Sequence, residues 1–201
     1  MGLNPAGAET MVKGVAFLGI YKFIKTQPGG EALMTKVIAS LSPEAKKVCQ
    51  RKVIAVVDYP YPVFINFLRA VDQVVGQGDL TLCRKLGVFA AIRDIESVYN
   101  LYKKRAGPED LFRDGPIIWR SYYQNAGRFQ TVDATPDHTI IHIYDFPHMD
   151  PAHCRLMEGW INQSLIEAGA VWIEEARETR CVSRGDPYHE FIGRWKPPAT
   201  A

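Results

Sequence analysis

Residues 128–146 read RFQTVDATPDHTIIHIYDF, and at this stretch the chain changes from helical to extended patterns. Its two segments, 128–133 and 138–146, are short and rich in Thr, Val, Ile, Phe and Tyr, the residue types found in strands. Between them lies Ala134-Thr135-Pro136-Asp137, a run of turn-forming residues. The stretch therefore predicts a β-hairpin.

A helix and a second hairpin are expected after it. Asp150-Pro151 is a helix start, because an acidic residue caps the first turn and proline suits the first helical position. Residues 171–183 and 188–195 then form strand-like segments around the turn Arg184-Gly185-Asp186-Pro187. The intervening helix carries one apolar stripe, made of Cys154, Met157, Ile161, Leu165 and Ala168. The C-terminal part therefore predicts the element order ββαββ.

Before residue 125 the apolar residues recur at intervals of three and four, which predicts helices and no strands. Ser42-Pro43 supplies an N-cap and a first-turn proline, and Asp58-Tyr59-Pro60-Tyr61-Pro62 interrupts the helical pattern. A short helix is expected to hold Ile117, Ile118, Trp119 and Tyr122. The longer helical patterns cover Met11–Thr26, Glu31–Leu41, Val63–Val75 and Leu80–Lys104.

These patterns predict an α+β fold, with a helical N-terminal half packed on a four-stranded antiparallel sheet. We expect a single domain over residues 1–201, with a helical part at about 11–125 and the ββαββ part at about 127–196.

Composition narrows the function classes. The chain has 24 basic and 22 acidic residues, a net charge of +2, and no basic block that would neutralise a run of phosphates. Nucleic acid is therefore not expected as a partner. No apolar run approaches the roughly 20 residues of a membrane span, and no signal-like segment opens the chain, so we expect a cytoplasmic protein. The 4 cysteines are too sparse for a disulfide framework and favour thiols or a metal site.

Potential metal ligands gather in the C-terminal third. Seven residues separate Cys181 from His189, and a turn between them brings a thiolate and an imidazole together, as a tetrahedral zinc requires. Cys154 and Glu178 are candidates for the third and fourth ligands. Regular strand alternation places Glu178 and Cys181 on opposite faces, so a bulge or loop must intervene. The alternative is that both cysteines are small buried apolar residues and His189 is a surface residue beside a turn.

The stretch from Cys154-Arg-Leu-Met-Glu-Gly159-Trp to Glu178-x-x-Cys181, Gly185-Asp186 and His189-Glu-Phe191 resembles the C-terminal signature of the 4-vinyl reductase family. Residues Val12-Lys13-Gly14, Tyr59-Pro60 and the stretch from Trp119 to Gly127 also look like standalone myxobacterial proteins of about 200 residues. The resemblance implies structural zinc held by Cys154, Glu178, Cys181 and His189, with histidine standing where the family has its last cysteine. The wider superfamily includes TRAPP tethering subunits and haem nitric-oxide sensors. This resemblance therefore leaves ligand sensing and protein scaffolding both open.

No nucleophile elbow, zinc-protease motif, phosphate loop or dinucleotide fingerprint is present, so we expect no enzyme. A reductase partner, bound to flavin or nicotinamide, is implied only by the family name. We expect instead a sensor domain with an apolar pocket for a small hydrophobic or aromatic molecule. Ordinary core packing is the alternative role of these aromatic residues, while His142 and His148 are also candidates to ligate haem. The expected pocket residues are Trp119, Tyr122, Tyr123, Phe129, His142 and Trp160.

Apolar residues surround the first helix and are not confined to one stripe, as Phe17, Leu18 and Phe23 illustrate. Such a helix must be buried on most sides. The second hypothesis is therefore a ligand-free interaction module that forms a homodimer through its N-terminal helices and binds a further protein partner.

Overall fold

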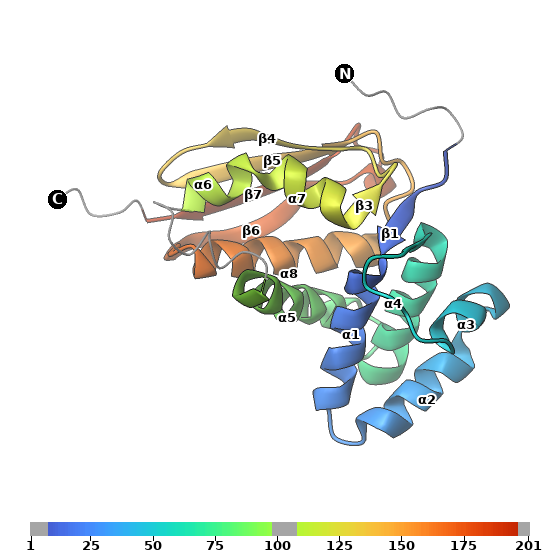
Figure 1. Cartoon of the computed structure of the whole chain (residues 1–201). Helices are drawn as coiled ribbons and strands as arrows, with labels where there is room; N and C mark the ends of the chain where they lie inside the picture. The colour runs from blue at the N-terminus through green and yellow to red at the C-terminus, as the bar shows by residue number, and fades with distance from the viewer. Residues whose placement is uncertain (1–7, 98–107, 197–201) are drawn as a thin grey trace.

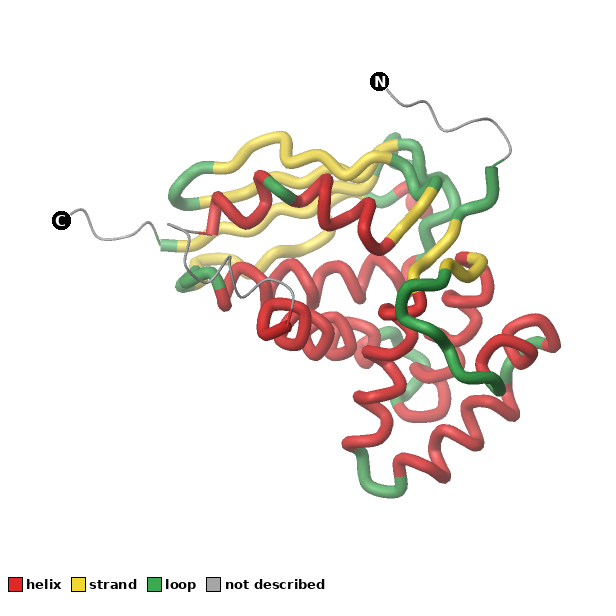
Figure 2. Tube along the Cα trace, viewed as in Figure 1, coloured by secondary structure: helices red, strands yellow, loops and turns green. Residues whose placement is uncertain are grey.

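The computed structural model of the chain describes residues 8–97 and 108–196. Its C-terminal part is a sheet with helix α8 (Pro151–Glu167) running beside it, and α5 (Thr81–Ser97) lies against α8 (Figure 1). Helices occupy most of the N-terminal half, and the long strands lie in the C-terminal half together with α8 (Figure 2). This arrangement confirms the expected α+β class.

The larger sheet has four antiparallel strands in the order β4-β5-β7-β6. Both expected hairpins are present, since β4 pairs with β5 and β6 pairs with β7. The two edge strands of this sheet are β4 and β6, and β6 lies beside α8. The strands are β4 (Arg128–Ala134), β5 (His138–Tyr144), β6 (Trp172–Arg180) and β7 (His189–Trp195).

Helix α8 begins where the sequence predicts. The Asp150 side chain accepts a hydrogen bond from the Ala152 amide at 2.8 Å, and Pro151 occupies the first helical position. Helices α5 and α8 approach closely through two glycines. A Cβ at Gly87 would overlap the Leu156 backbone, and one at Gly159 would overlap the Arg84 backbone. This close crossing needs glycine on both helices.

The remaining helices lie mainly to one side of the α5–α8 pair, except that α6 and α7 pack against β4 (Figure 1). Ser42 caps α3 as expected, because its hydroxyl accepts from the Ala45 amide. These helices are α1 (Gly14–Thr26), α2 (Gly30–Ser40), α3 (Pro43–Cys49), α4 (Tyr61–Val75), α6 (Pro108–Arg113) and α7 (Gly115–Tyr122). In the described part of the chain, no helix is long and apolar enough to cross a membrane.

The expectation that the N-terminal half contains no strands is wrong. Segments β1 (Met11–Lys13), β2 (Asp58–Pro60) and β3 (Tyr123–Gln124) form a three-stranded sheet in the order β2-β1-β3. Each segment is too short to show a period of two, and its partners are distant in sequence. The helix expected from Met11 therefore begins at Gly14. The helix expected to reach Lys104 is described only as far as Ser97, and the remainder falls outside the described residues.

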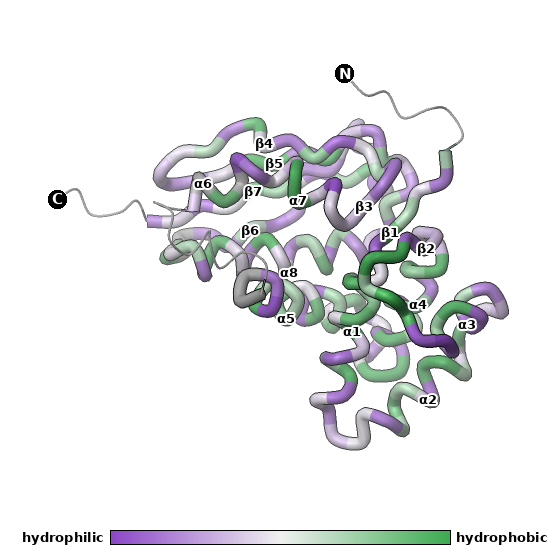
Figure 3. Tube along the Cα trace, viewed as in Figure 1, coloured by the Kyte–Doolittle hydropathy of each residue, from purple (hydrophilic) through white to green (hydrophobic). Residues whose placement is uncertain are grey.

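The apolar sides of α1 are covered by other parts of the same chain. Phe17 packs on Phe64 and Phe67 of α4, while the Phe23 ring meets Phe89 of α5 edge-on. A strongly hydrophobic segment, residues 53–57, also lies beside the start of α1 (Figure 3). The all-round apolar character of α1 therefore has an explanation within one chain, without a second copy.

Candidate functional site

Four potential metal ligands meet where α8, β6 and β7 come together. Cys154 lies in the first turns of α8, Glu178 in β6, Cys181 just after β6, and His189 at the start of β7. One side-chain ligand atom from each lies within 4.8 Å of all the others. The structure thus brings together all four residues of the expected metal site.

Backbone irregularity at the end of β6 places Glu178 and Cys181 on one side. The register between β6 and β7 shifts between Glu178 and Arg180, as the spacing of the ligands requires. A short 3-10 helix, Val182–Arg184, follows Cys181, and Gly185 turns the chain with a φ of 93°. Asp186 accepts a hydrogen bond from the Cys181 amide at 2.8 Å. This loop positions the Cys181 thiol against α8.

The cluster is buried and polar. The Sγ atoms of Cys154 and Cys181 are 3.9 Å apart, and Cys154 Sγ lies 3.6 Å from His189 Nδ1. His189 Nδ1 is also 3.0 Å from the Glu178 carboxylate. His189 is 0% exposed, which excludes the alternative in which it is a surface residue. Its Nε2 atom is buried and has no hydrogen-bond partner among the described residues, so Nδ1 makes the polar contacts.

Burial and the neighbouring groups shift two pKa values in opposite directions. Burial, reinforced by the nearby Glu178 carboxylate, raises the pKa of the Cys154 thiol. Burial alone would also raise the pKa of Glu178, but hydrogen bonds from His189 and the two thiols outweigh it and lower that pKa. Without a bound cation the Cys154 thiol is therefore protonated, and a cation must displace its proton to bind.

Two α8 side chains that were not predicted from the sequence hold β6 beside the cluster. Asn162 pairs with the Ala176 backbone, donating to its carbonyl and accepting from its amide, both at 2.8 Å. Glu158 accepts from the Glu178 amide at 2.9 Å. These two side chains take the place of a neighbouring strand along the β6 edge. Their spacing of four residues within a buried helix was the available signal.

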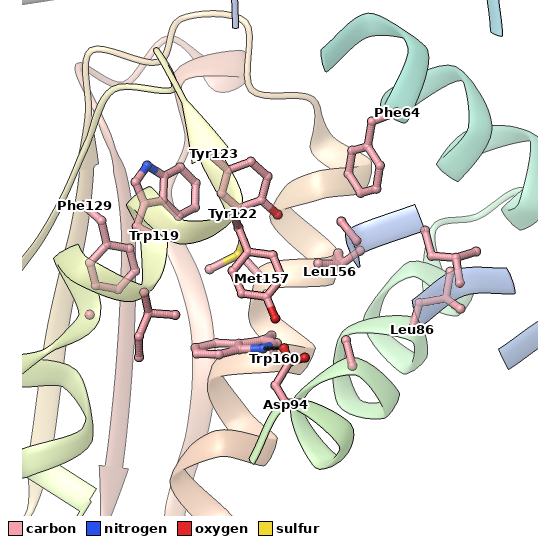
Figure 4. Close-up of a pocket in the computed structure, with 15 residues that line it drawn as sticks. Phe64, Leu86, Asp94, Trp119, Tyr122, Tyr123, Phe129, Leu156, Met157 and Trp160 are labelled. Carbon is pink, nitrogen blue, oxygen red and sulfur yellow. Dashed lines mark hydrogen bonds between the residues drawn. The ribbon is translucent and has the colours of Figure 1, made fainter. Parts of the chain in front are cut away.

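An apolar cavity of about 60 Å³ lies between α1, α5, α7 and α8. Figure 4 shows its aromatic lining, with Asp94 beside Trp160 at one end. The apolar lining includes Leu86 from α5 and Leu156 and Met157 from α8. Five of the six expected pocket residues line it, namely Trp119, Tyr122, Tyr123, Phe129 and Trp160.

The sixth expected pocket residue, His142, lies elsewhere. Its neighbours Ile141 and Ile143 are fully buried, so strand alternation turns His142 to the opposite face of the sheet. There it contacts the Tyr144 hydroxyl at 2.6 Å and the Glu190 carboxylate at 2.7 Å. His148, the other candidate haem ligand, is exposed. Neither histidine lines the cavity.

Two polar features of the cavity were not found from the sequence. Asp94 accepts from the Trp160 indole nitrogen at 3.0 Å, and burial raises the pKa of its carboxyl. His153 is completely buried and stacks on Trp119. Its Nδ1 lies 3.1 Å from the Tyr61 hydroxyl and its Nε2 lies 2.9 Å from the Tyr123 hydroxyl. Burial lowers the pKa of His153 to about 3, so the ring is neutral.

No family model matches the chain, and no curated protein matches it. Among solved structures, an H-NOX protein from S. oneidensis aligns with a TM-score of 0.70 and 12% identity, covering 92% of this chain and 99% of that one. An H-NOX protein from K. algicida aligns with a TM-score of 0.68 and 11% identity, covering 93% and 98%. An oxygen-binding H-NOX domain related to soluble guanylate cyclases aligns with a TM-score of 0.62 and 13% identity, covering 94% and 98%.

The expected membership of the 4-vinyl reductase family is contradicted by these alignments. That resemblance depended on short motifs in the C-terminal third, whereas the likeness to H-NOX structures extends over more than nine-tenths of the chain. At identities of 11–13% the likeness concerns the fold alone. Function must therefore be argued from the sites.

Proposed function

We propose that this chain is a non-catalytic sensor domain that binds a small hydrophobic or aromatic molecule in the cavity between α1, α5, α7 and α8. The observation that carries the proposal is the cavity lining, in which aromatic and aliphatic side chains surround a space with one carboxylate, Asp94, at its edge. Small-molecule sites combine such an apolar wall with a few placed polar groups. The lining holds no pairing of a nucleophile with a base, which favours binding over chemistry.

The cavity volume limits what enters without rearrangement. About 60 Å³ corresponds to roughly two water molecules at the volume each has in the liquid. A single aromatic ring needs more room, about 150 Å³ by the benzene-binding example. Met157 and Leu156 in the wall are flexible side chains that can move aside. Binding of an aromatic molecule therefore shifts the α8 side chains, and this shift is the signal a sensor needs.

Haem does not fit this cavity. The similar H-NOX structures include an Fe(II)NO form and an oxygen complex, and haem distortion is described for the H-NOX family. Haem iron is usually held by His, Cys or Tyr, or by Met together with His, and the described lining of this cavity contains neither His nor Cys. Its two tyrosines are already engaged, since Tyr123 contacts His153 and Tyr122 bonds to Asp94. His153 already contacts a tyrosine hydroxyl through each ring nitrogen, and the volume is several times below the roughly 300 Å³ at which ligand pockets begin. We therefore assign no haem role to the cavity.

Native mass spectrometry of protein purified from its own host tests ligand binding. We expect a bound small molecule in the wild-type protein and its loss in Ala90→Leu, because Ala90 lines the cavity and the larger side chain fills it. Ala32→Leu adds the same side chain at an exposed position on α2 and should retain the ligand. The proposal fails if the wild-type protein carries no ligand and no small aromatic compound binds it at millimolar concentration.

We also propose that Cys154, Glu178, Cys181 and His189 hold a structural zinc ion. At a tetrahedral zinc, with Zn–S near 2.3 Å and Zn–N near 2.0–2.1 Å, two sulfurs lie about 3.8 Å apart and sulfur and nitrogen about 3.5 Å apart. The corresponding separations here are 3.9 Å and 3.6 Å. Four protein ligands leave no position for water, so the role is to hold the β6–β7 loop against α8.

Elemental analysis with variants tests the zinc site. We expect about one equivalent of zinc in the wild-type protein and a large loss in Cys181→Ser. Cys83→Ser is the matched control, because Cys83 is also buried but lies on α5 outside the cluster. Less than about a tenth of an equivalent in the wild-type protein, with an unchanged melting temperature in chelator, would leave the four side chains as a hydrogen-bonded core cluster.

A further inference from the structure

The hydrogen-bonded chain Tyr61–His153–Tyr123 contains one hydroxyl hydrogen for which it has no acceptor. Tyr61 accepts a hydrogen bond from the Asp150 amide at 3.0 Å and also contacts His153 Nδ1. His153 Nε2 contacts the Tyr123 hydroxyl. A neutral imidazole can accept only one hydroxyl hydrogen, because its other nitrogen is itself a donor. One of the two tyrosines therefore has a hydroxyl hydrogen with no acceptor among these groups.

The position of the cavity indicates which tyrosine has the hydroxyl hydrogen without an acceptor. If His153 carried its hydrogen on Nδ1, the Tyr61 oxygen would accept twice and its own hydrogen would be stranded. Tyr61 is 4% exposed, packs against Phe146 and does not line the cavity. A stranded buried donor costs about 1–3 kcal/mol. With the hydrogen on Nε2, the extra hydrogen belongs to Tyr123, which borders the open space. A doubly protonated ring would leave the Tyr123 hydrogen free as well.

Resting on the proposed binding function, we infer that the cavity ligand is an uncharged apolar molecule with one hydrogen-bond acceptor, such as a carbonyl oxygen, which receives the Tyr123 hydroxyl hydrogen. Figure 4 shows the Tyr123 ring between Trp119 and Phe64, with its hydroxyl directed toward the middle of the lining side chains. In its Nε2–H form, His153 donates a hydrogen bond to the Tyr123 hydroxyl oxygen and so fixes the position of this hydroxyl.

The opposite end of the cavity excludes anions. Asp94 is half-buried and accepts a hydrogen bond from the Trp160 N–H. Burial raises the pKa of its carboxyl, and hydrogen bonds from Trp160 and Tyr122 offset part of this rise. The described lining of the cavity contains no Lys, Arg or His, so an anionic ligand would lose its water there without gaining a counter-charge. The acceptor is therefore a neutral oxygen or nitrogen and not a carboxylate.

Acetophenone and α-methylstyrene are suitable probes, because they have similar shape and differ in a carbonyl oxygen against a methylene group. Emission from Trp119 and Trp160, both in the lining, reports binding of each compound. Water solvates the ketone better, so the informative quantity is the ratio of the two Kd values in each variant. In Tyr123→Phe we expect the Kd of acetophenone divided by the Kd of α-methylstyrene to rise about three- to tenfold, with the Kd of α-methylstyrene unchanged.

Tyr144→Phe is the matched control, since it removes the same hydroxyl group from a residue that does not line the cavity and contacts His142 instead, and its ratio should equal that of the wild-type protein. If both compounds bind and the ratio is the same in Tyr123→Phe, the inference is overturned while the binding function stands. If neither compound binds the wild-type protein, the inference is overturned, and native mass spectrometry then decides the binding function separately.

Nitrogen chemical shifts of the His153 ring give a second reading on the unmodified protein. We expect hydrogen on Nε2 in the acetophenone complex. Hydrogen on Nδ1 alone would mean that Tyr123 donates to the ring, and would overturn the inference.

Discussion

Substituting Gly159 by alanine should weaken the protein at the crossing of α5 and α8. A Cβ built at Gly159 lies 2.9 Å from the Arg84 carbonyl carbon and 3.0 Å from the Val88 amide nitrogen, whereas ordinary contacts begin at 3.4 Å. The carbonyl oxygen of Arg84 is closer still. All these atoms are backbone, so no side chain can move aside, and the helices must separate by at least 0.5 Å, the difference between 3.4 Å and 2.9 Å.

A gap of this size forfeits about a quarter or more of the contact energy across the crossing. Overpacking of this kind costs typically about 1–3 kcal/mol, and we expect the upper end because both sides are backbone. Alanine recovers about 1 kcal/mol of helix propensity. The net loss of unfolding free energy is then about 2 kcal/mol, which corresponds to a fall in melting temperature of roughly 4–8 °C for a chain of this length.

Thermal unfolding followed by circular dichroism measures the effect, with Gly19→Ala as control. Gly19 lies within α1, and a Cβ there meets nothing within 4 Å. The same substitution should therefore raise stability at Gly19, by about 0.5–1 kcal/mol. A melting temperature of Gly159→Ala equal to or above that of the wild-type protein would refute the reasoning, whatever Gly19→Ala does.

Two further predictions concern the cavity and the β6 edge. Burial raises the Asp94 pKa, so its favourable contribution to stability is complete below the unfolded pKa and is lost as pH rises through the folded pKa. The Asp94→Asn protein has no carboxyl to ionise here, so its unfolding free energy relative to the wild-type protein should rise from acidic to neutral pH. Urea unfolding measures this difference, and a constant difference across that range would contradict the assignment. Asn162→Ala leaves the Ala176 amide and carbonyl without their α8 partner, and should cost about 2–4 kcal/mol. Hydrogen exchange at the Ala176 amide should accelerate, and unchanged protection there would show that another group replaces Asn162.

Local chemistry in the sequence was sufficient for the C-terminal architecture. Strand composition, turn residues and the Asp150-Pro151 cap each act over a few neighbouring residues, so they predict the ββαββ order without knowledge of distant contacts. A hairpin likewise brings Cys181 and His189 together, whereas the meeting of Cys154 with them depends on the packing of α8 against the sheet. The spacing of Glu178 from Cys181 even required the irregularity that the strand shows.

Only the tertiary structure decided the rest, because it depends on segments that are distant in sequence. The β2-β1-β3 sheet joins segments centred near residues 12, 59 and 123, each too short to carry a periodic signal. The His153 contacts join α4, β3 and α8, and no local pattern marks a histidine as lying between two tyrosines. Family motifs confined to the C-terminal third pointed to the 4-vinyl reductase family, while the H-NOX likeness lies in the arrangement of the whole chain. Backbone arrangement can persist at 11–13% identity because many side-chain combinations fill the same core, so it is visible only in three dimensions.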